Sequence, residues 1–254
     1  RPDAFDDCVV GGLPGAGDMA ARNHPVTRMA PSVTVLQLDT EFPRVPGDVG
    51  CKQTYVGDIE IIRIANATVG QIVSSNPATI PIAPFEAALT AANGEVVVTS
   101  CGFLSYWQTH LQSRTDKPFI SSALTALHQL CNFHVPHDIL TLTFDASRLN
   151  AQHFGPYETD VIGLPTDMHL RQVISQNLTE LDVDLATREV TEFVMTQRKE
   201  HHKHILLECT NLPPYKDAIG SATGLPITDI LTCIEGVRPN TIRSAFLTHQ
   251  WSNP

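Results

Sequence analysis

The segment Glu95-Val-Val-Val-Thr-Ser-Cys-Gly-Phe-Leu104 places a thiol, Cys101, between an apolar run and a following helical pattern. The run is almost entirely apolar or β-branched, as is typical of a strand buried on both faces of a parallel sheet. The same arrangement recurs later in the chain. His204-Ile-Leu-Leu-Glu208 is a second strand pattern, and Cys209 ends it before Thr210-Asn-Leu-Pro-Pro-Tyr215. We therefore expect two equivalent strand-to-helix corners, each with a cysteine.

The position of these two thiols suggests chemistry. In α/β sheets, ligands bind outside the carboxyl ends of the strands. The start of a helix at such a place also lowers the pKa of a thiol. Cys101 and Cys209 could thus face one small substrate from opposite sides. This is the geometry needed to remove a proton from one face of a carbon and deliver one to the other.

Strand and helix patterns alternate along the chain from Ser32, which indicates parallel sheets with right-handed crossovers. The predicted strands are 33–38, 59–64, 96–100, 119–122, 138–144, 160–163 and 204–208, and the predicted helices are 85–92, 105–113, 123–132, one or two within 168–201, and 215–222. The fold class is α/β, with two lobes, each a parallel sheet flanked by helices, and the active site in the cleft between them. We expect a flexible lead-in over 1–30, a first lobe formed by 31–117 with 226–254, and a second lobe over 118–225.

Composition excludes several classes of function. The 254-residue chain has a net charge of −10, which argues against nonspecific nucleic-acid binding because that relies on Lys and Arg. Its apolar runs are shorter than the roughly 18–20 residues of a membrane-spanning helix, and its N-terminus lacks a signal-peptide pattern. The six cysteines include no CxxC pair, so we expect a reduced, cytoplasmic protein without a structural zinc site.

Most of the cysteines have a structural interpretation, because a buried thiol is a common core residue. Cys8, Cys51, Cys131 and Cys233 have no motif around them. The two corner thiols differ through their neighbours. Gly102 lets a backbone approach a ligand closely, and Thr210 and Asn211 place a hydroxyl and an amide beside Cys209.

Four segments of the chain resemble the aspartate/glutamate racemase superfamily, which includes amino-acid racemases, hydantoin racemase, maleate isomerase and arylmalonate decarboxylase. The segments are Leu36–Gly50, Thr99–Leu104, Leu140–Leu149 and Leu207–Tyr215. They occur in the order and spacing of that superfamily, from about Ser32 to the end of the chain. They indicate the superfamily without indicating the substrate.

The resemblance implies two pseudo-symmetric lobes, an active site between them and no cofactor. It implies that Cys101 and Cys209 are the paired acid and base, one as a thiolate and the other as a thiol. Asp39 matches an acidic residue that the racemases place near the first cysteine. The further substrate-binding residues that we expect are Thr40, Gly102, Phe103, Thr143, Thr210 and Asn211. Their N–H and hydroxyl donors would stabilise the carbanion or enediolate electrostatically.

The chain departs from the glutamate racemases at both corners. Those enzymes typically have Asn-Thr after the first cysteine and Thr-His after the second. Here the residues are Gly102-Phe103 and Thr210-Asn211. The first change weakens the case for a free α-amino group on the substrate, and the second removes an imidazole that could tune Cys209. Glutamate is therefore not the expected substrate.

The expected function is a cofactor-independent racemase or epimerase that moves a proton at the α-carbon of an amino acid or related carboxylate. One alternative is a maleate-type cis–trans isomerase or a decarboxylase of the same superfamily. A decarboxylase generally keeps only the second cysteine, so the presence of both argues against it. A second alternative is a non-catalytic binding protein for small carboxylates. The expected partner is a small carboxylate substrate, without nucleic acid or membrane, and the apolar segments are compatible with a homo-oligomer.

Three histidines, His201, His202 and His204, raise the question of a metal site. They follow a polar helix pattern without an acidic or thiol partner at ligand spacing in the sequence. Histidines at a helix C-terminus also interact favourably with its dipole. We therefore expect a solvated helical turn and no metal.

Overall fold

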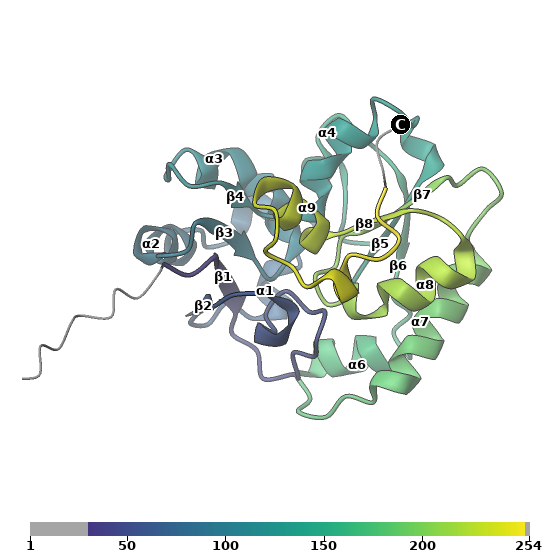
Figure 1. The fold of residues 1–254 in the computed structure, drawn as a ribbon, viewed down its shortest axis with the longest axis horizontal. Helices are drawn as coiled ribbons and strands as arrows, with labels where there is room; N and C mark the ends of the chain where they lie inside the picture. The colour runs from purple at the N-terminus through teal and green to yellow at the C-terminus, as the bar shows by residue number, and fades with distance from the viewer. Residues whose placement is uncertain (1–29, 252–254) are drawn as a thin grey trace, which may run out of the picture.

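The computed structural model describes residues 30–251, which form two four-stranded parallel sheets (Figure 1). The first has the order β2-β1-β3-β4 and the second β6-β5-β7-β8. The strands are β1 (Val33–Leu38), β2 (Ile59–Ile64), β3 (Val96–Thr99), β4 (Phe119–Ile120), β5 (Ile139–Thr143), β6 (Asp160–Gly163), β7 (His204–Leu207) and β8 (Ile227–Thr228). The predicted two-lobed α/β class is confirmed. The expected lead-in over 1–30 lies outside the described residues, except for residue 30.

The two sheets have the same topology. In each half of the chain, the first strand in sequence lies between the second and the third strands in the sheet. Both third strands, β3 and β7, are four residues long and buried along their whole length. Burial on both faces explains their continuous apolar sequences. One residue separates each of these strands from its cysteine, so Cys101 and Cys209 occupy equivalent positions in the two halves.

Helices cover the sheets and connect their strands (Figure 1). The α-helices are α1 (Val69–Ile72), α2 (Ala83–Ala91), α3 (Gln108–Gln112), α4 (Leu127–Leu130), α5 (Ala151–Phe154), α6 (His169–Gln176), α7 (Val183–Gln197), α8 (Lys216–Thr223) and α9 (Ile230–Val237). The predicted long helical region over 168–201 is two helices, α6 and α7. In the part of the chain that the structure describes, no helix is both long and apolar enough to cross a membrane.

The lobe boundaries differ from the sequence-based prediction at two strands. β4 follows position 118 but pairs with β3, so the first sheet continues to Ile120. β8 lies after position 226 but pairs with β7 and belongs to the second sheet. The chain then returns, because Ile230, Leu231 and Ile234 of α9 pack in the same apolar cluster as β1 and β3. Strand pairing thus shifts both boundaries by a few residues.

At both thiol corners a 3₁₀ turn precedes the α-helix, where the sequence predicted a helical run after the cysteine. After Cys101 the chain forms η3 (Gly102–Trp107) and then α3. After Cys209 it forms η6 (Pro213–Tyr215) and then α8. Pro213 and Pro214 lack the N–H groups that an α-helix uses. The dipole of a full helix therefore does not begin at either thiol.

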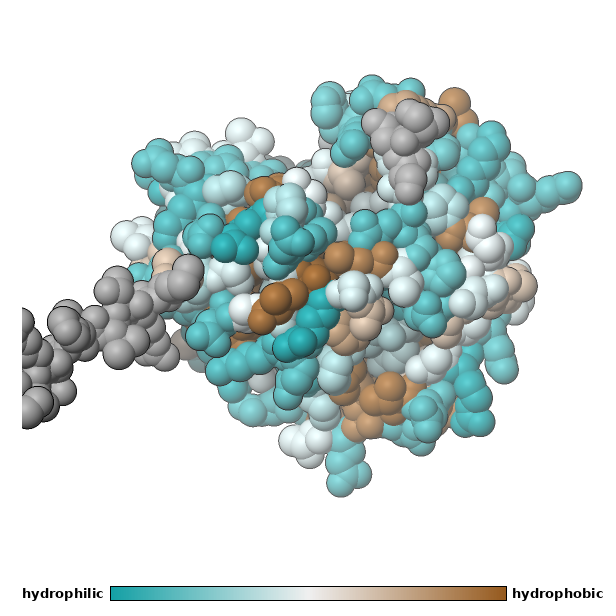
Figure 2. Space-filling view, viewed as in Figure 1, coloured by the Kyte–Doolittle hydropathy of each residue, from teal (hydrophilic) through white to brown (hydrophobic). Residues whose placement is uncertain are grey.

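The outer surface is largely polar on the face shown in Figure 2, with a short apolar band across its middle. The apolar side chains concentrate inside instead. One buried cluster contains residues of both sheets, such as Leu36 and Val97 from the first and Leu140 and Ile205 from the second. The two lobes therefore share a core, which fixes their thiol-bearing strand ends against each other.

Candidate functional site

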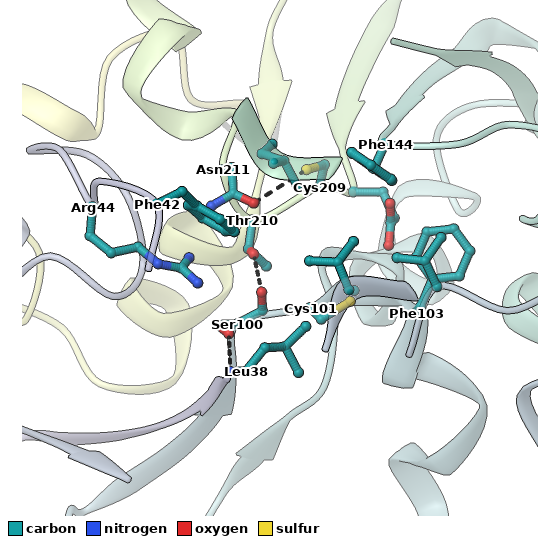
Figure 3. Close-up of a pocket in the computed structure, with 15 residues that line it drawn as sticks. Leu38, Phe42, Arg44, Ser100, Cys101, Phe103, Phe144, Cys209, Thr210 and Asn211 are labelled. Atoms are coloured by element: carbon teal, nitrogen blue, oxygen red, sulfur yellow. Dashed lines mark hydrogen bonds between the residues drawn. The ribbon is translucent and has the colours of Figure 1, made fainter. Parts of the chain in front are cut away.

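Cys101 and Cys209 line one pocket between the carboxyl ends of β3 and β7 (Figure 3). Both side chains are buried. The cavity volume is about 20 Å³, which is room for one or two water molecules. A substrate can therefore occupy this pocket only when the side chains around it move.

The pocket wall is mainly apolar, with a small group of polar side chains. The apolar residues are Leu38, Phe42, Val69, Val73, Phe103, Phe144 and Ile174, and the polar ones besides the thiols are Arg44, Ser100, Glu208, Thr210 and Asn211. Few polar groups in an apolar wall are typical of small-molecule sites. In such a wall each charge acts with little screening by water.

A short hydrogen bond connects the two lobes beside the thiols. The Thr210 hydroxyl, next to Cys209, donates to the carbonyl oxygen of Ser100, next to Cys101, at 2.6 Å. The Ser100 hydroxyl accepts from the backbone N–H of Leu38 at the end of β1, at 3.0 Å. The ends of three strands are therefore held together at the base of the pocket.

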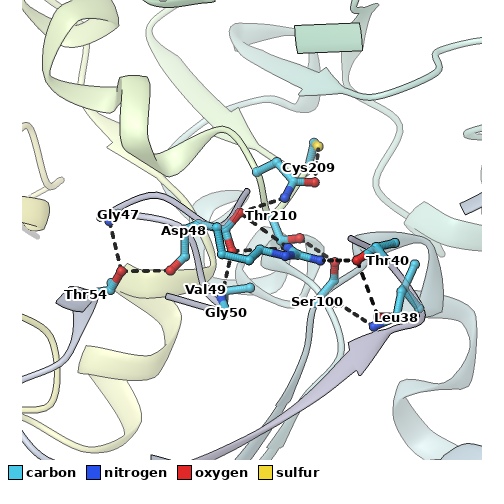
Figure 4. Close-up of polar contacts among 12 residues, drawn as sticks. Leu38, Thr40, Gly47, Asp48, Val49, Gly50, Thr54, Ser100, Cys209 and Thr210 are labelled. Atoms are coloured by element: carbon cyan, nitrogen blue, oxygen red, sulfur yellow. Dashed lines mark hydrogen bonds and ion pairs between the residues drawn. The ribbon is translucent and has the colours of Figure 1, made fainter. Parts of the chain in front are cut away.

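Arg44 is held by a polar network that includes Asp48 and Thr40, both labelled in Figure 4. Its guanidinium lies 3.2 Å from an Asp48 carboxylate oxygen and donates to the Thr40 hydroxyl at 3.1 Å. Asn211 donates to the other Asp48 oxygen at 2.7 Å. Through that amide the network reaches Cys209, whose thiol lies 3.8 Å from the Asn211 side-chain oxygen.

The two thiols are neutral at neutral pH in this structure. Burial, and secondly the nearby Glu208 carboxyl, raise the pKa of Cys101 to about 12. The same two causes raise the pKa of Cys209 well above its usual range. The expected lowering of these pKa values by a helix start is therefore wrong, because burial disfavours the thiolate more than the local donors stabilise it. A thiolate here needs additional positive charge.

Glu208 is the buried carboxyl group between β7 and Cys209, and it lines the pocket without any exposure to solvent. The Thr143 hydroxyl donates to its Oε2 at 2.5 Å. Burial raises the pKa of Glu208 to about 7. Gly102 lies directly against it, since a Cβ at position 102 would be 2.1 Å from Glu208 Oε1.

The structure brings most of the predicted site residues together. Cys101, Cys209, Gly102, Phe103, Thr210 and Asn211 all line the pocket. Thr40 and Thr143 lie outside the lining and hold Arg44 and Glu208 in place.

Asp39 is not in the pocket lining. Its carboxylate pairs with Arg63 on β2 at 2.5 Å and accepts from the backbone N–H of Asn66. These contacts lower the pKa of Asp39. In the parallel pairing of β1 and β2, Arg63 lies beside Gln37, which is two residues before Asp39. Arg63 is therefore close enough to pair with Asp39 at the surface.

Sequence reasoning missed two charged pocket residues, Arg44 and Glu208. Both lie inside segments that carried the family resemblance. A signal was present for Glu208, because it is the charged residue at the end of an otherwise apolar strand. Arg44 lies in a Pro- and Gly-rich loop, where no periodicity indicates the direction of a side chain.

The histidines after α7 have an acidic partner that the sequence did not indicate. Asp160 on β6 lies 3.2 Å from His201 and 3.1 Å from His202, and the three ligand atoms lie within 4.8 Å of one another. His202 is buried, so the expected solvated turn is wrong for this residue. Its Nδ1 accepts from the Lys199 N–H, so Nε2 of the neutral ring carries the proton and donates to Asp160. That arrangement fits a hydrogen-bonded cluster better than a metal site.

His204 is separate from this cluster. It is buried, and its ring lies 2.9 Å from the Thr228 hydroxyl on β8. Burial lowers the pKa of His204 to about 3. It is thus a neutral core residue and contributes to neither the histidine cluster nor the pocket.

Solved structures with a similar fold include two racemases. Glutamate racemase RacE1 from Bacillus anthracis aligns with a TM-score of 0.51 at 14% identity, over 84% of each chain. Allantoin racemase from Pseudomonas fluorescens aligns with a TM-score of 0.50 at 13% identity, over 87% of this chain and 97% of the other. The fold is that of these racemases. The expected resemblance is thereby confirmed at the level of the fold.

Sequence relatives carry a different name, and no family model matches the chain. The chain is 27% identical over 230 residues to dimethylsulfoniopropionate lyase 5 of Emiliania huxleyi, covering 83% of this chain and 45% of that protein. It is 26% identical over 279 residues to the dimethylsulfoniopropionate lyase of Durusdinium sp. clade D, covering 97% and 91%. The chain spans about half the length of the first of these relatives. An enzyme on a racemase-type fold is supported, whereas an isomerase is not confirmed.

Proposed function

We propose that this protein is a cofactor-independent lyase that removes a proton from the carbon next to a carboxylate and eliminates a neutral sulfide. The substrate that we propose is dimethylsulfoniopropionate, the compound in the names of its sequence relatives. The observation that carries the proposal is the convergence of Cys101 and Cys209 on one closed, largely apolar pocket that also contains Arg44.

The proposed reaction balances without an oxidant, a reductant or a second substrate. A cysteine thiolate takes the α-proton, and the electron pair of the C–H bond forms the double bond between the α- and β-carbons. The bond from the β-carbon to sulfur breaks, and its electron pair leaves with sulfur. The products are dimethyl sulfide and acrylate. The proton remains on the thiol and then passes to solvent.

Cys101 is our proposed base. The pKa of both thiols is raised, but Arg44 lies near enough to Cys101 to offset part of that rise. The charge of Asp48 adds to the rise for Cys209. A sulfonium group would bring further positive charge into the pocket and stabilise the thiolate. Arg44 would hold the substrate carboxylate, because a guanidinium matches a carboxylate in geometry and charge.

A second candidate is the racemase or epimerase that the sequence predicted. It is favoured by the equivalent positions of Cys101 and Cys209 after the third strand of each sheet. Such a reaction requires both thiols, one to take the α-proton and one to return a proton from the other face. An elimination requires one base, so the two candidates differ in what each cysteine contributes.

The experiment is an assay in deuterated water that follows dimethyl sulfide by headspace gas chromatography and the organic products by NMR. The protein would be incubated with dimethylsulfoniopropionate and, separately, with a panel of amino acids, hydantoins and small diacids. The variants are Cys101→Ala and Cys209→Ala. Cys131→Ala is the control, because this partly buried thiol lies outside the pocket.

The lyase proposal expects dimethyl sulfide and acrylate, lost in Cys101→Ala, reduced in Cys209→Ala and unchanged in Cys131→Ala. Deuterium entering the α-position of a panel compound, abolished by either pocket substitution, would establish the racemase instead. An isomerised diacid or a decarboxylated product would point to the other superfamily reactions. A protein that turns over none of these compounds would not be the lyase that we propose.

A further inference from the structure

Glu208 is an acidic side chain that the proposed proton transfer does not use. It lies in a pocket where the other charged lining residue is Arg44. It is fully buried, and burying a carboxylate is costly unless it is paired or hydrogen-bonded. The burial of Glu208 in this pocket therefore indicates a role beyond packing.

The two carboxyl oxygens of Glu208 differ in their surroundings. Oε2 accepts the Thr143 hydroxyl at 2.5 Å, which fixes the orientation of the group. Oε1 is buried and has no hydrogen-bond partner among residues 30–251. A buried acceptor left unpaired costs about 1–3 kcal/mol. Oε1 is therefore available to a group that enters the pocket.

The carboxyl group of Glu208 lies against the backbone of the opposite lobe at Gly102. Gly102 has an ordinary negative φ, so its backbone conformation alone does not require glycine. A Cβ at this position would lie 2.1 Å from Glu208 Oε1 and 2.6 Å from the Glu208 carbonyl oxygen. The pairing of a glycine with a glutamate across the two thiol corners thus makes room for the carboxyl group.

Positive and negative charges lie on different sides of the thiols. Figure 3 shows Arg44 on one side of the pocket, with Phe103 on the other side of the two cysteines. Phe103 directly follows Gly102, which contacts Glu208. The pocket therefore has a cationic end at Arg44 and an anionic end at Glu208, where Phe103 adds an aromatic ring.

We propose that Glu208 receives the cationic group of a zwitterionic substrate whose carboxylate faces Arg44. The inference rests on the proposed function only for the identity of that cation as a sulfonium. A sulfonium has no N–H group to donate, so its attraction to Oε1 is Coulombic. Aromatic rings such as Phe103 attract onium groups through their faces.

This placement also gives Glu208 a role in selecting substrates. Its charge disfavours the thiolate at both Cys101 and Cys209. A bound cation at Oε1 offsets that charge, so the thiolate forms more readily when an onium group is present. A neutral analogue of the same shape would leave the thiols protonated. Glu208 is on this view a specificity-determining residue.

The test compares two carboxylates of nearly equal shape: the zwitterion 3-(trimethylammonio)propanoate and 4,4-dimethylpentanoate, in which a neutral tert-butyl group replaces the cationic group. Isothermal titration calorimetry would measure both with the wild type and with Glu208→Gln, which keeps an acceptor for Thr143. We expect the wild type to prefer the zwitterion at least about 10-fold, equivalent to about 1.4 kcal/mol. Glu208→Gln should lose that preference. Asp39→Asn, which removes an acidic group outside the pocket, should retain it.

A second measurement needs no variant. The wild-type preference should be larger at pH 8.5 than at pH 5.5, because the pKa of Glu208 is about 7. The other charged or titratable groups facing it or its neighbours are Arg44, Arg171 against Phe144, His153 against Phe103, and the two thiols. The pKa of Cys101 and Cys209 lies above this window. Burial lowers the pKa of His153. Glu208→Gln keeps His153, so any pH dependence that comes from His153 remains in this variant and can be subtracted.

The outcomes separate this inference from the proposed lyase reaction, since dimethyl sulfide release is measured in the same preparations. Equal binding of the two ligands by the wild type, binding of neither, or an undiminished preference in Glu208→Gln would overturn the role of Glu208. Any of these together with normal sulfide release would leave the lyase proposal standing. A Glu208-dependent preference without sulfide release would support the zwitterion pocket and reject the lyase.

Discussion

Glu208 Oε1 occupies a space that exists only because residue 102 is a glycine, and this contact joins the corner of the first thiol to that of the second. The atoms that a Cβ would meet include the Glu208 carbonyl oxygen as well as its side chain. The backbone atom cannot move aside as a flexible side chain could. The two corners are therefore fitted to each other at these two residues.

Gly102→Ala should reduce both stability and activity. We expect a loss of about 1–3 kcal/mol in the free energy of unfolding, as for other overpacked interiors, together with displacement of the Glu208 carboxyl group. Urea melts and the sulfide-release assay would measure these effects. Gly236→Ala in α9 is the control, because a Cβ there meets nothing within 4 Å. It should leave activity unchanged and add up to about 1 kcal/mol of stability.

Stability should fall with rising pH through the titration of Glu208. Its pKa of about 7 in the folded state exceeds the ordinary value of 4.5, so between these values the folded chain binds a proton that the unfolded chain has lost. Above pH 7, folding must bury the carboxylate. We expect this group alone to cost about 2 kcal/mol between pH 5.5 and pH 8.5. Urea melts of the wild type and Glu208→Gln at pH 5.5 and pH 8.5 isolate the contribution of Glu208 to the free energy of unfolding. If the stability of both proteins changed equally with pH, the prediction would be wrong.

Arg44→Met should weaken both the turnover of a carboxylate substrate and the fold. The substitution removes the proposed partner of the substrate carboxylate and one partner of Asp48, which still accepts from Asn211 and from the Gly50 N–H. Losing one member of a buried charge pair costs about 2–5 kcal/mol. We therefore expect kcat/KM for dimethylsulfoniopropionate to fall by at least about 30-fold. Arg63→Met, which removes a partly exposed arginine outside the pocket, should leave kcat/KM unchanged.

Asp229→Asn should strongly destabilise the fold. Lys216 Nζ lies 2.8 Å from Asp229 Oδ2, and both side chains are buried. Asp229 also caps α9 by accepting the Thr232 N–H, a role that asparagine retains. The substitution leaves the buried ammonium of Lys216 without its charged partner, which should lower the free energy of unfolding by about 3–5 kcal/mol. Urea melts would measure it, and adding Lys216→Met should recover much of the loss if the charge is the cause.

The sequence predicted the fold well because parallel strands buried on both faces have a distinctive apolar pattern. The ranges of β1 and β2 agree with the prediction to the residue, and the two cysteines were correctly placed after β3 and β7. β4 and β8 are only two residues long, too short for a pattern to assign them to a sheet. The lobe boundaries were wrong for that reason.

The site was less predictable because it depends on contacts between distant residues. No local pattern shows that Gly102 faces Glu208, or that Asp160 faces His201 and His202. The pKa of each thiol is likewise set by burial in the folded chain, which the residue types around a helix start do not indicate. The residue types at the strand ends indicated where the site lies, whereas the electrostatic environment of those residues could be found only from the structure.

The hydrogen bond from the Thr210 hydroxyl to the Ser100 carbonyl oxygen constrains how the pocket can open. It joins the lobes next to both thiols, while Phe42, Val69 and Val73 close the pocket around them. If the lobes part by rotating about this bond, the mouth widens while the two sulfur atoms keep nearly the same separation. The two thiols would then keep their relative placement while a ligand enters and leaves, and only the outer wall of the pocket would have to move.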